Sequence, residues 1–145
     1  MHTVEKWMTR PAASISPDAA ALEALERMVE GEFRHLPVVE CDGRLVGVLS
    51  FNDLRAALHF RVTLAAAPSV SMDRFAALEH VVRDLMTSAP ATARADEPLV
   101  DAAQRMAERR IGCLPVVDVK GTLVGILTET DALLAMVELS RSARG

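Results

Sequence analysis

Aromatic residues are scarce in this chain of 145 residues, which contains four phenylalanines, Trp7 and no tyrosine. Binding that depends on stacking bases against aromatic side chains is therefore not expected. The chain also lacks a basic surplus, because its formal net charge is −4. A nucleic-acid-binding surface usually needs a basic face, so nucleic acid is not an expected partner. A single small basic pocket for a phosphate remains compatible with this charge.

Long apolar runs are also missing. The longest uncharged stretch, roughly residues 62–72, is shorter than the ~20 residues that cross a bilayer. The charged N-terminal residues do not resemble a signal peptide. Cys41 and Cys113 lie far apart without CxxC spacing, which favours reduced thiols over a metal site. These absences predict a cytoplasmic protein with no membrane span and no metal.

The chain contains one pattern twice. Residues 35–53 read HLPVVECDGRLVGVLSFND, and residues 113–131 read CLPVVDVKGTLVGILTETD. The offset of 78 residues continues without a gap back to Val4 and Val82. Self-similarity at a fixed spacing indicates one supersecondary unit built twice, and the cleft between two like halves is where a ligand is expected first. The predicted boundaries are 1–60 and 82–140 for the repeats, 61–81 for a linker and covering helix, and 141–145 for a frayed tail.

Each repeat is predicted to form a lead-in strand, a helix, two strands and a second helix, which is an α/β (α+β) fold. Ser16 and Pro17 suggest the N-cap and first residue of one helix, and residues 96–98 suggest the start of its counterpart. Residues 73–86 are also predicted to be helical. The apolar spacing predicts inward-facing side chains at Leu22, Leu25, Met28, Val29, Val100, Ala103, Met106, Ala107, Leu54, Ala57, Leu58, Ala132, Leu133, Met136 and Val137.

Two glycines occupy matching places in the second predicted strand of each repeat. Gly47 and Gly125 allow a close approach of another backbone or a ligand, or they mark a plain bulge. The sequence leaves these alternatives open. Asp42-Gly43 and Lys120-Gly121 are turn signals between the two strands.

The strongest local signal is a hydroxyl residue followed three positions later by an aspartate, at residues 50–53 and 128–131. The spacing alone favours a capping box, in which the hydroxyl and the acid satisfy amides at a helix start. A functional interpretation uses the same atoms. A carboxylate at a strand–turn–helix edge can accept two hydrogen bonds from the vicinal diol of a ribose, and free helix amides can bind phosphate.

A second signal is the pair Arg34-His35, just before the first LPVV strand. It is either a solvated helix end or a phosphate contact, since arginine offers a planar fork of donors. The second repeat has Gly112-Cys113 instead, so the two sites are not expected to be equivalent. The four histidines share no spacing with a nucleophile or metal partner, and no Gly-rich phosphate loop is present. Catalysis is therefore not expected.

These residues together resemble the CBS domain pair, also called a Bateman module. The matching signature is an apolar helix followed by LPVVD-x-x-G-x-LVG-[IV]-[LV]-[ST]-x-x-D, and it occurs twice between Val4 and about Leu139. The resemblance implies two tandem β-α-β-β-α repeats related by a pseudo-two-fold axis, and association into a homodimer. Glu40, in place of the usual aspartate, is a departure expected to be neutral.

The resemblance also implies an adenosine-type regulatory ligand, namely AMP, ADP, ATP, NAD or S-adenosylmethionine, and no catalytic cofactor. The residues that it assigns to ribose and phosphate are Ser50, Asn52, Asp53, Thr128, Thr130 and Asp131, with Arg34 and His35 for phosphate and Ser14 and Thr92 for the base pocket. The predicted function is a regulatory module that acts on a separate, unidentified protein. The alternatives are a ligand-free structural or interaction module and an enzyme acting on nucleotides.

Overall fold

The computed structural model describes residues 2–57 and 80–145. The chain divides into two compact units: a first-repeat unit of Ala13–Ala89, and a second-repeat unit of Met1–Ala12 with Pro90–Gly145. The lead-in segments, residues 4–9 of the first repeat and 82–87 of the second, thus each pack in the unit that holds the other repeat. The compact units therefore differ from the stretches 1–60 and 82–140 that the sequence pattern delimits.

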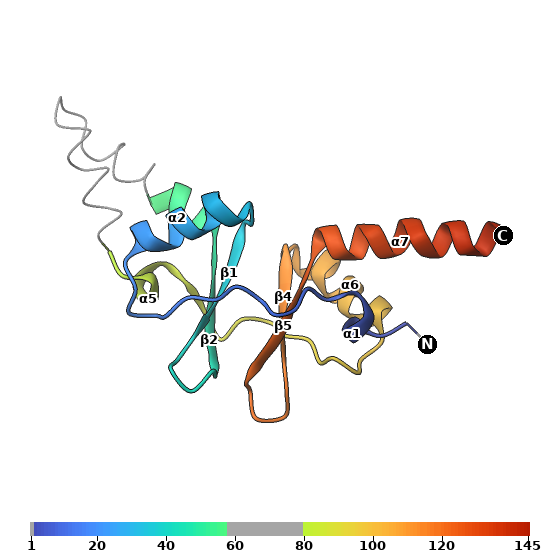
Figure 1. Cartoon of the computed structure of the whole chain (residues 1–145), viewed down its shortest axis with the longest axis horizontal. Helices are drawn as coiled ribbons and strands as arrows, with labels where there is room; N and C mark the ends of the chain where they lie inside the picture. The colour runs from blue at the N-terminus through green and yellow to red at the C-terminus, as the bar shows by residue number, and fades with distance from the viewer. Residues whose placement is uncertain (1, 58–79) are drawn as a thin grey trace. The chain divides into compact units, whose positions relative to one another are not determined.

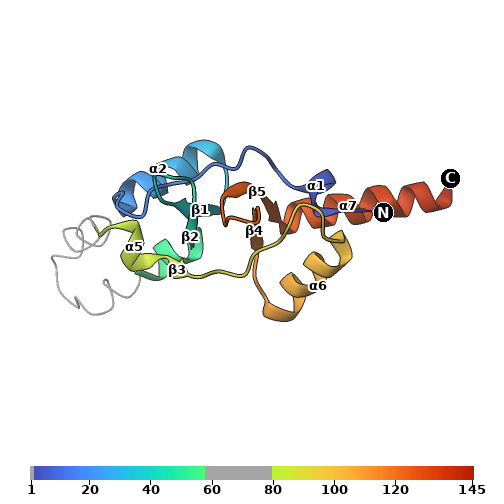
Figure 2. The same cartoon turned by 90° about the horizontal axis from the view of Figure 1, so that it is seen from below.

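The first-repeat unit is a small sheet covered by helices. Its elements in chain order are α2 (Ala21–Gly31), β1 (His35–Val39), β2 (Leu45–Ser50), a helical stretch over 51–57, α5 (Val82–Leu85) and β3 (Thr87–Ser88). β1 pairs antiparallel with one edge of β2, and β3 pairs antiparallel with the other edge. Figure 2 shows β3 beside β2. Leu36, Val38, Leu49 and Leu54 form the centre of its core.

The second-repeat unit repeats this plan with a segment from the N-terminus. Its elements are α1 (Val4–Trp7), α6 (Leu99–Arg109), β4 (Cys113–Val117), β5 (Leu123–Thr128) and α7 (Glu129–Arg144). β4 pairs antiparallel with β5, and Thr9 bridges to Ile126 on β5. α1 lies beside α7 (Figure 1). α7 is helical up to Arg144, whereas the sequence predicts a frayed tail from residue 141.

The mixed helix and strand architecture with two tandem repeats is as predicted, with two differences. The lead-in segments, predicted as strands, begin with the short helices α1 and α5, and the helix that follows the first lead-in segment begins later than expected. α2 starts at Ala21, not at Pro17. The Ser16 hydroxyl accepts a hydrogen bond from the Asp18 amide at 3.2 Å, and the Ser16 carbonyl accepts one from Ala19 at 3.2 Å. Ser16 therefore closes a turn before the helix, because short polar side chains bond readily to nearby amides.

Several apolar side chains predicted to face inward are exposed. The buried residues are Ala21, Ala24 and Met28 on α2, Leu99, Ala102 and Met106 on α6, and Ala135 on α7; Met28 and Met106 are buried as predicted. Alanines thus occupy buried positions on all three helices, and several larger apolar residues lie on the exposed faces. The side chains predicted to face inward that are exposed instead are Leu22, Val29, Val100, Ala107, Leu133, Met136 and Val137.

Gly47 and Gly125 are sites of close backbone approach. A Cβ atom on Gly47 would lie 2.5 Å from Met86 Sδ and 2.9 Å from the carbonyl oxygen of Thr87. A Cβ on Gly125 would lie 2.9 Å from Met8 Sδ and 3.0 Å from the carbonyl oxygen of Thr9. Both open alternatives are observed. The approaching backbone is the lead-in segment of the other repeat, and the register of each hairpin shifts beside the glycine, between Val38 and Val39 and between Val116 and Val117.

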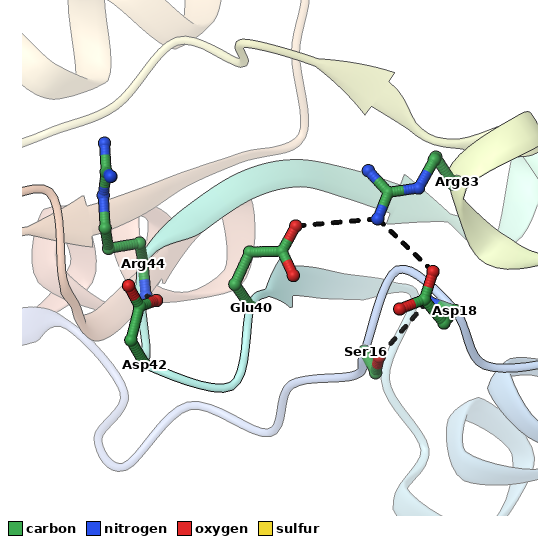
Figure 3. A network of polar contacts seen from close by, with 6 residues as sticks. All are labelled: Ser16, Asp18, Glu40, Asp42, Arg44 and Arg83. Atoms are coloured by element: carbon green, nitrogen blue, oxygen red, sulfur yellow. Dashed lines mark hydrogen bonds and ion pairs between the residues drawn. The ribbon is translucent and has the colours of Figure 1, made fainter.

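Arg83 on α5, in the lead-in segment of the second repeat, forms ion pairs with residues of the first repeat. Its guanidinium lies 3.3 Å from Asp18 Oδ1 and 3.6 Å from Glu40 Oε1, and Figure 3 shows it between the two carboxylates. The matching position 78 residues earlier is Glu5, which pairs with Arg10 at 3.6 Å instead. These ion pairs are exposed, so each contributes at most about 1 kcal/mol.

Some predictions fall on residues that the structure does not describe. Leu58 and residues 61–79 of the expected linker and covering helix lie outside the described ranges. The structure describes the end of the helix expected over 73–86, and this part is helical at Val82–Leu85. Within the described ranges, no helix is long and apolar enough to cross a membrane.

Candidate functional site

Each unit carries one hydroxyl–aspartate pair at a helix start, and both pairs form the same reciprocal contact. Asp53 Oδ2 accepts a hydrogen bond from the Ser50 amide at 2.9 Å, and Ser50 Oγ accepts one from the Asp53 amide at 3.0 Å. Thr128 and Asp131 repeat this arrangement at 2.9 and 3.3 Å. The capping-box prediction is confirmed at both places. Both aspartates remain half-buried rather than enclosed, and Asn52 and Thr130 are exposed.

The Asp131 carboxylate has a further neighbour from the lead-in segment. The Thr9 hydroxyl donates to it, at 3.3 Å from Oδ1 and 3.4 Å from Oδ2. Main-chain hydrogen bonds hold Thr9 in place, since its amide donates to Ile126 at 2.8 Å and its carbonyl accepts from Ile126 at 3.0 Å. Asp131 therefore meets hydrogen-bond donors from two separate segments of its unit.

Arg34 and His35 lie at the start of the helix that carries Asp53. His35 is the register partner of Ser50 across the β1–β2 hairpin. The Arg34 carbonyl accepts a hydrogen bond from the Phe51 amide at 2.7 Å, and the Arg34 side chain is exposed. The main chain of the basic pair thus lies beside the main chain of the first hydroxyl–aspartate pair.

Cys113 takes the place of His35 in the second-repeat unit, opposite Thr128. It is buried, and this burial raises the pKa of its thiol to about 12, with a smaller contribution from the negative charge of Glu129. The side chain is therefore a neutral thiol near pH 7 and offers no positive charge for a phosphate. The predicted inequivalence of the two basic positions has this physical basis.

The two residues predicted for a base pocket are each held by an arginine from the following helix. Arg105 on α6 donates to the Thr92 carbonyl and to Glu97 Oε1, both at 2.9 Å. Arg27 on α2 donates in the same way to the Ser14 carbonyl, and it also donates to Glu23 Oε1 at 3.0 Å. The backbone around Ser14 and Thr92 is fixed by the same device in both units.

Two hollows adjoin candidate site residues, one at Asp131 and the other at Arg34. One of about 450 Å³, within the second-repeat unit, is lined by Trp7, Asp131, Leu134, Val137, Glu138 and Arg141. The other, of about 250 Å³ in the first-repeat unit, is lined by Met28, Val29, Glu32, Phe33, Arg34 and Phe51. The described residues contain no group of three His, Cys, Asp or Glu side chains that could hold a metal ion.

The geometry and the repeat agree with one family model, that of the CBS domain, which matches residues 4–60 and 82–138. The chain belongs to the CBS domain family. The match covers both repeats, including the lead-in segments and the two hydroxyl–aspartate pairs, so the sequence resemblance is confirmed.

Several CBS proteins are similar to this chain over nearly its whole length. A CBS domain-containing protein of Dictyostelium discoideum is 32% identical over 137 residues, covering 94% of this chain and 92% of the relative. The structure of CBSX2 in complex with AMP has a TM-score of 0.80 at 33% identity, covering 97% of this chain and 99% of that one. The CBS pair of MJ0100, bound to 5′-methylthioadenosine and S-adenosylmethionine, has a TM-score of 0.78 at 25% identity, covering 95% and 98%.

Other CBS relatives are much longer proteins with enzyme names, homoserine O-acetyltransferase among them. This chain spans 22–24% of their length. Their names therefore describe proteins of which a CBS pair is a minor part.

Sequence reasoning does not single out Thr9, Arg27 or Arg105 as parts of the candidate site. A signal for the arginines is present, since Arg27 and Arg105 are separated by the repeat offset of 78 residues. The Met-Thr sequence that contains Thr9 is also repeated at this offset. The residues around Thr9 do not indicate which of the two aspartates its hydroxyl contacts. That contact joins residues 122 positions apart.

Proposed function

We propose that this chain is a regulatory module that binds an adenosine ligand at its two hydroxyl–aspartate pairs. Asp53 and Asp131 accept hydrogen bonds from ribose hydroxyls. Arg34 and His35 contact phosphate, and the backbone around Ser14 and Thr92 contacts the base. Ser50, Asn52, Thr128 and Thr130 contribute hydroxyl, amide and main-chain groups to the sugar and phosphate.

One observation carries this proposal: a CBS pair that is 33% identical over 97% of this chain binds AMP. The carboxylates support it, because each keeps acceptor capacity beyond its capping bond. An ionised carboxylate has about four acceptor positions, and the helix start uses one of those of Asp53. The ligand class is therefore AMP, ADP, ATP, NAD or S-adenosylmethionine, and the module's role is regulatory rather than catalytic.

The proposed assembly is a homodimer that acts on a separate protein in the cytoplasm. Leu133, Leu134 and Met136 on α7 are 58, 58 and 59% exposed, and a second copy would bury them. A ligand could alter such an assembly only by binding one arrangement more tightly than another. Free thiols at Cys41 and Cys113 fit a reducing compartment.

A ligand-free scaffold is the second candidate, and the complete capping boxes favour it. The contacts of Asp53 and Asp131 with their helix starts account for both carboxylates without any ligand. In that case the repeated geometry of the two helix starts serves stability alone, and replacing an aspartate removes only a cap, at about 0.5–2 kcal/mol.

Calorimetric titration with AMP, ATP, NAD and S-adenosylmethionine separates the two candidates. We expect binding by the parent protein and loss of binding, by about a hundredfold or more, in the double variant Asp53→Ala plus Asp131→Ala. The matched control is Asp18→Ala, which removes an exposed carboxylate outside the site. If none of the four ligands gives a heat of binding at millimolar concentration, the ligand-free scaffold is the better account of the chain. The same conclusion follows if the double variant keeps the affinity of the parent protein.

A further inference from the structure

Beyond the replacement of His35 by Cys113, the carboxylates of the two aspartates differ in one contact. The Thr9 hydroxyl lies 3.3 and 3.4 Å from the two oxygens of the Asp131 carboxylate, so it spans the group. Thr9 is exposed, and its main chain is held by paired hydrogen bonds to Ile126. The hydroxyl is therefore presented to Asp131 from a fixed backbone.

The matching threonine of the other unit makes no such contact. Thr87 pairs with Val48 on β2, and Val48 is the counterpart of Ile126 at the repeat offset. Within residues 2–57 and 80–145, Thr87 donates no side-chain hydrogen bond to Asp53, whose carboxylate accepts only from the Ser50 amide. The main-chain placement is thus the same in both units, and the difference lies in the threonine side chains.

This difference affects what each carboxylate can offer to a ligand. A vicinal diol donates one hydrogen bond to each oxygen of a carboxylate, and the Thr9 hydroxyl already interacts with both oxygens of Asp131. A ribose arriving there must displace that hydroxyl or accept a poorer geometry. A ribose arriving at Asp53 has no threonine hydroxyl of the described residues to displace.

We propose that Thr9 is a specificity-determining residue that weakens ribose binding at Asp131. This inference rests on the proposed function, because it requires both aspartates to bind ribose.

The test measures AMP affinity in two single-site backgrounds by calorimetry. In Asp53→Ala, which leaves the Asp131 site, we expect Thr9→Val to tighten AMP binding three- to tenfold and Thr9→Ser to leave it at the parent value. In Asp131→Ala, the matched change Thr87→Val should leave AMP binding unaltered. The gain from Thr9→Val should vanish with 2′,3′-dideoxyadenosine monophosphate, which lacks the diol, and a general change in folding would not produce that dependence.

The outcomes separate this inference from the function on which it rests. If AMP binds in the Asp53→Ala background and Thr9→Val leaves the affinity unchanged or lowers it, Thr9 does not compete with ribose and the inference is wrong. If the gain is equal for AMP and for the dideoxy compound, competition with the diol is likewise refuted. If neither single-site background nor the parent protein binds AMP, the proposed function and this inference both fall.

Discussion

Arg105 holds the main-chain oxygen of Thr92 at 2.9 Å, and it reaches Glu97 at the same distance with its other terminal nitrogen. Glu97 in turn accepts a hydrogen bond from the Arg94 amide at 2.8 Å. These four residues thus link the loop before α6 to the helix in one hydrogen-bonded network. The ion pair is the least exposed of those in the described residues, with side chains that are 31 and 17% accessible.

Arg105, which binds the Thr92 carbonyl, and Arg27, which binds the Ser14 carbonyl, should therefore contribute unequally to stability. We expect Arg105→Ala to lower the free energy of unfolding by about 1–3 kcal/mol, because it leaves a partly buried carboxylate and a carbonyl without their charged donor. Arg27→Ala should cost about 0–1 kcal/mol, since the pair Arg27–Glu23 is nearly half exposed. Urea unfolding of both variants measures the difference. Equal losses, or a larger loss for Arg27→Ala, would contradict this ranking.

The strand glycines should not tolerate a methyl group. In Gly125→Ala the new Cβ meets both the Met8 sulfur, which can move, and the Thr9 carbonyl oxygen at 3.0 Å, which is fixed by hydrogen bonds. We expect a loss of about 1–3 kcal/mol in the free energy of unfolding, and a similar loss for Gly47→Ala.

The control for the strand glycines is Gly121→Asn. Gly121 has a φ of 84°, and a Cβ added there would have no atom of the described residues within 4 Å. Asparagine accepts left-handed backbone better than most residues, so the cost should be below about 1 kcal/mol. Thermal or urea unfolding of the three variants makes the comparison. A strand glycine variant as stable as the parent protein would show that the lead-in segment can move aside.

The duplicated pattern predicted the repeats, the turns at Gly43 and Gly121, and the capping boxes, because each of these depends on residues within a few positions of one another. Two features could not be predicted this way. The buried side of α2 is set by Ala21 and Ala24, whose small size permits close packing, and periodicity cannot choose between that stripe and the one through Leu22 and Val29. The exchange of lead-in segments depends on contacts between distant parts of the chain, such as Arg83 with Glu40.

Cys113 should make stability fall at high pH. The folded protein holds the pKa of this thiol at about 12 against an ordinary value of 9.0, so the unfolded chain loses its proton first. The stabilising contribution is complete below pH 9 and declines by about 1.4 kcal/mol per pH unit as the pH rises toward 12. Urea unfolding between about pH 8 and 10.5 measures the slope. Cys113→Ala should have a smaller slope than the parent, and identical slopes would contradict the assignment.

The two thiols should also differ in reactivity. Cys41 is exposed and Cys113 is buried, and only the thiolate form reacts with disulfide reagents. At about pH 8 under native conditions we expect Ellman's reagent to titrate one thiol quickly, and to reach the second only after unfolding. Cys41→Ala should abolish the fast phase, whereas Cys113→Ala should retain it. A fast phase that survives in Cys41→Ala would mean that Cys113 is accessible.

The exposed apolar side chains of α7 should determine whether the chain self-associates. Leu133 and Met136 are more than half exposed, and they follow each other at helical spacing, so a second copy would remove both from water. We expect the parent protein to sediment as a dimer, and Leu133→Asp plus Met136→Asp to sediment as a monomer, because a buried unpaired charge is strongly unfavourable. The control is Val119→Asp, at a position that is 82% exposed but lies in the β4–β5 turn. Its sedimentation should match that of the parent. A monomeric parent, or a double variant that remains dimeric, would show that α7 does not form the interface between copies.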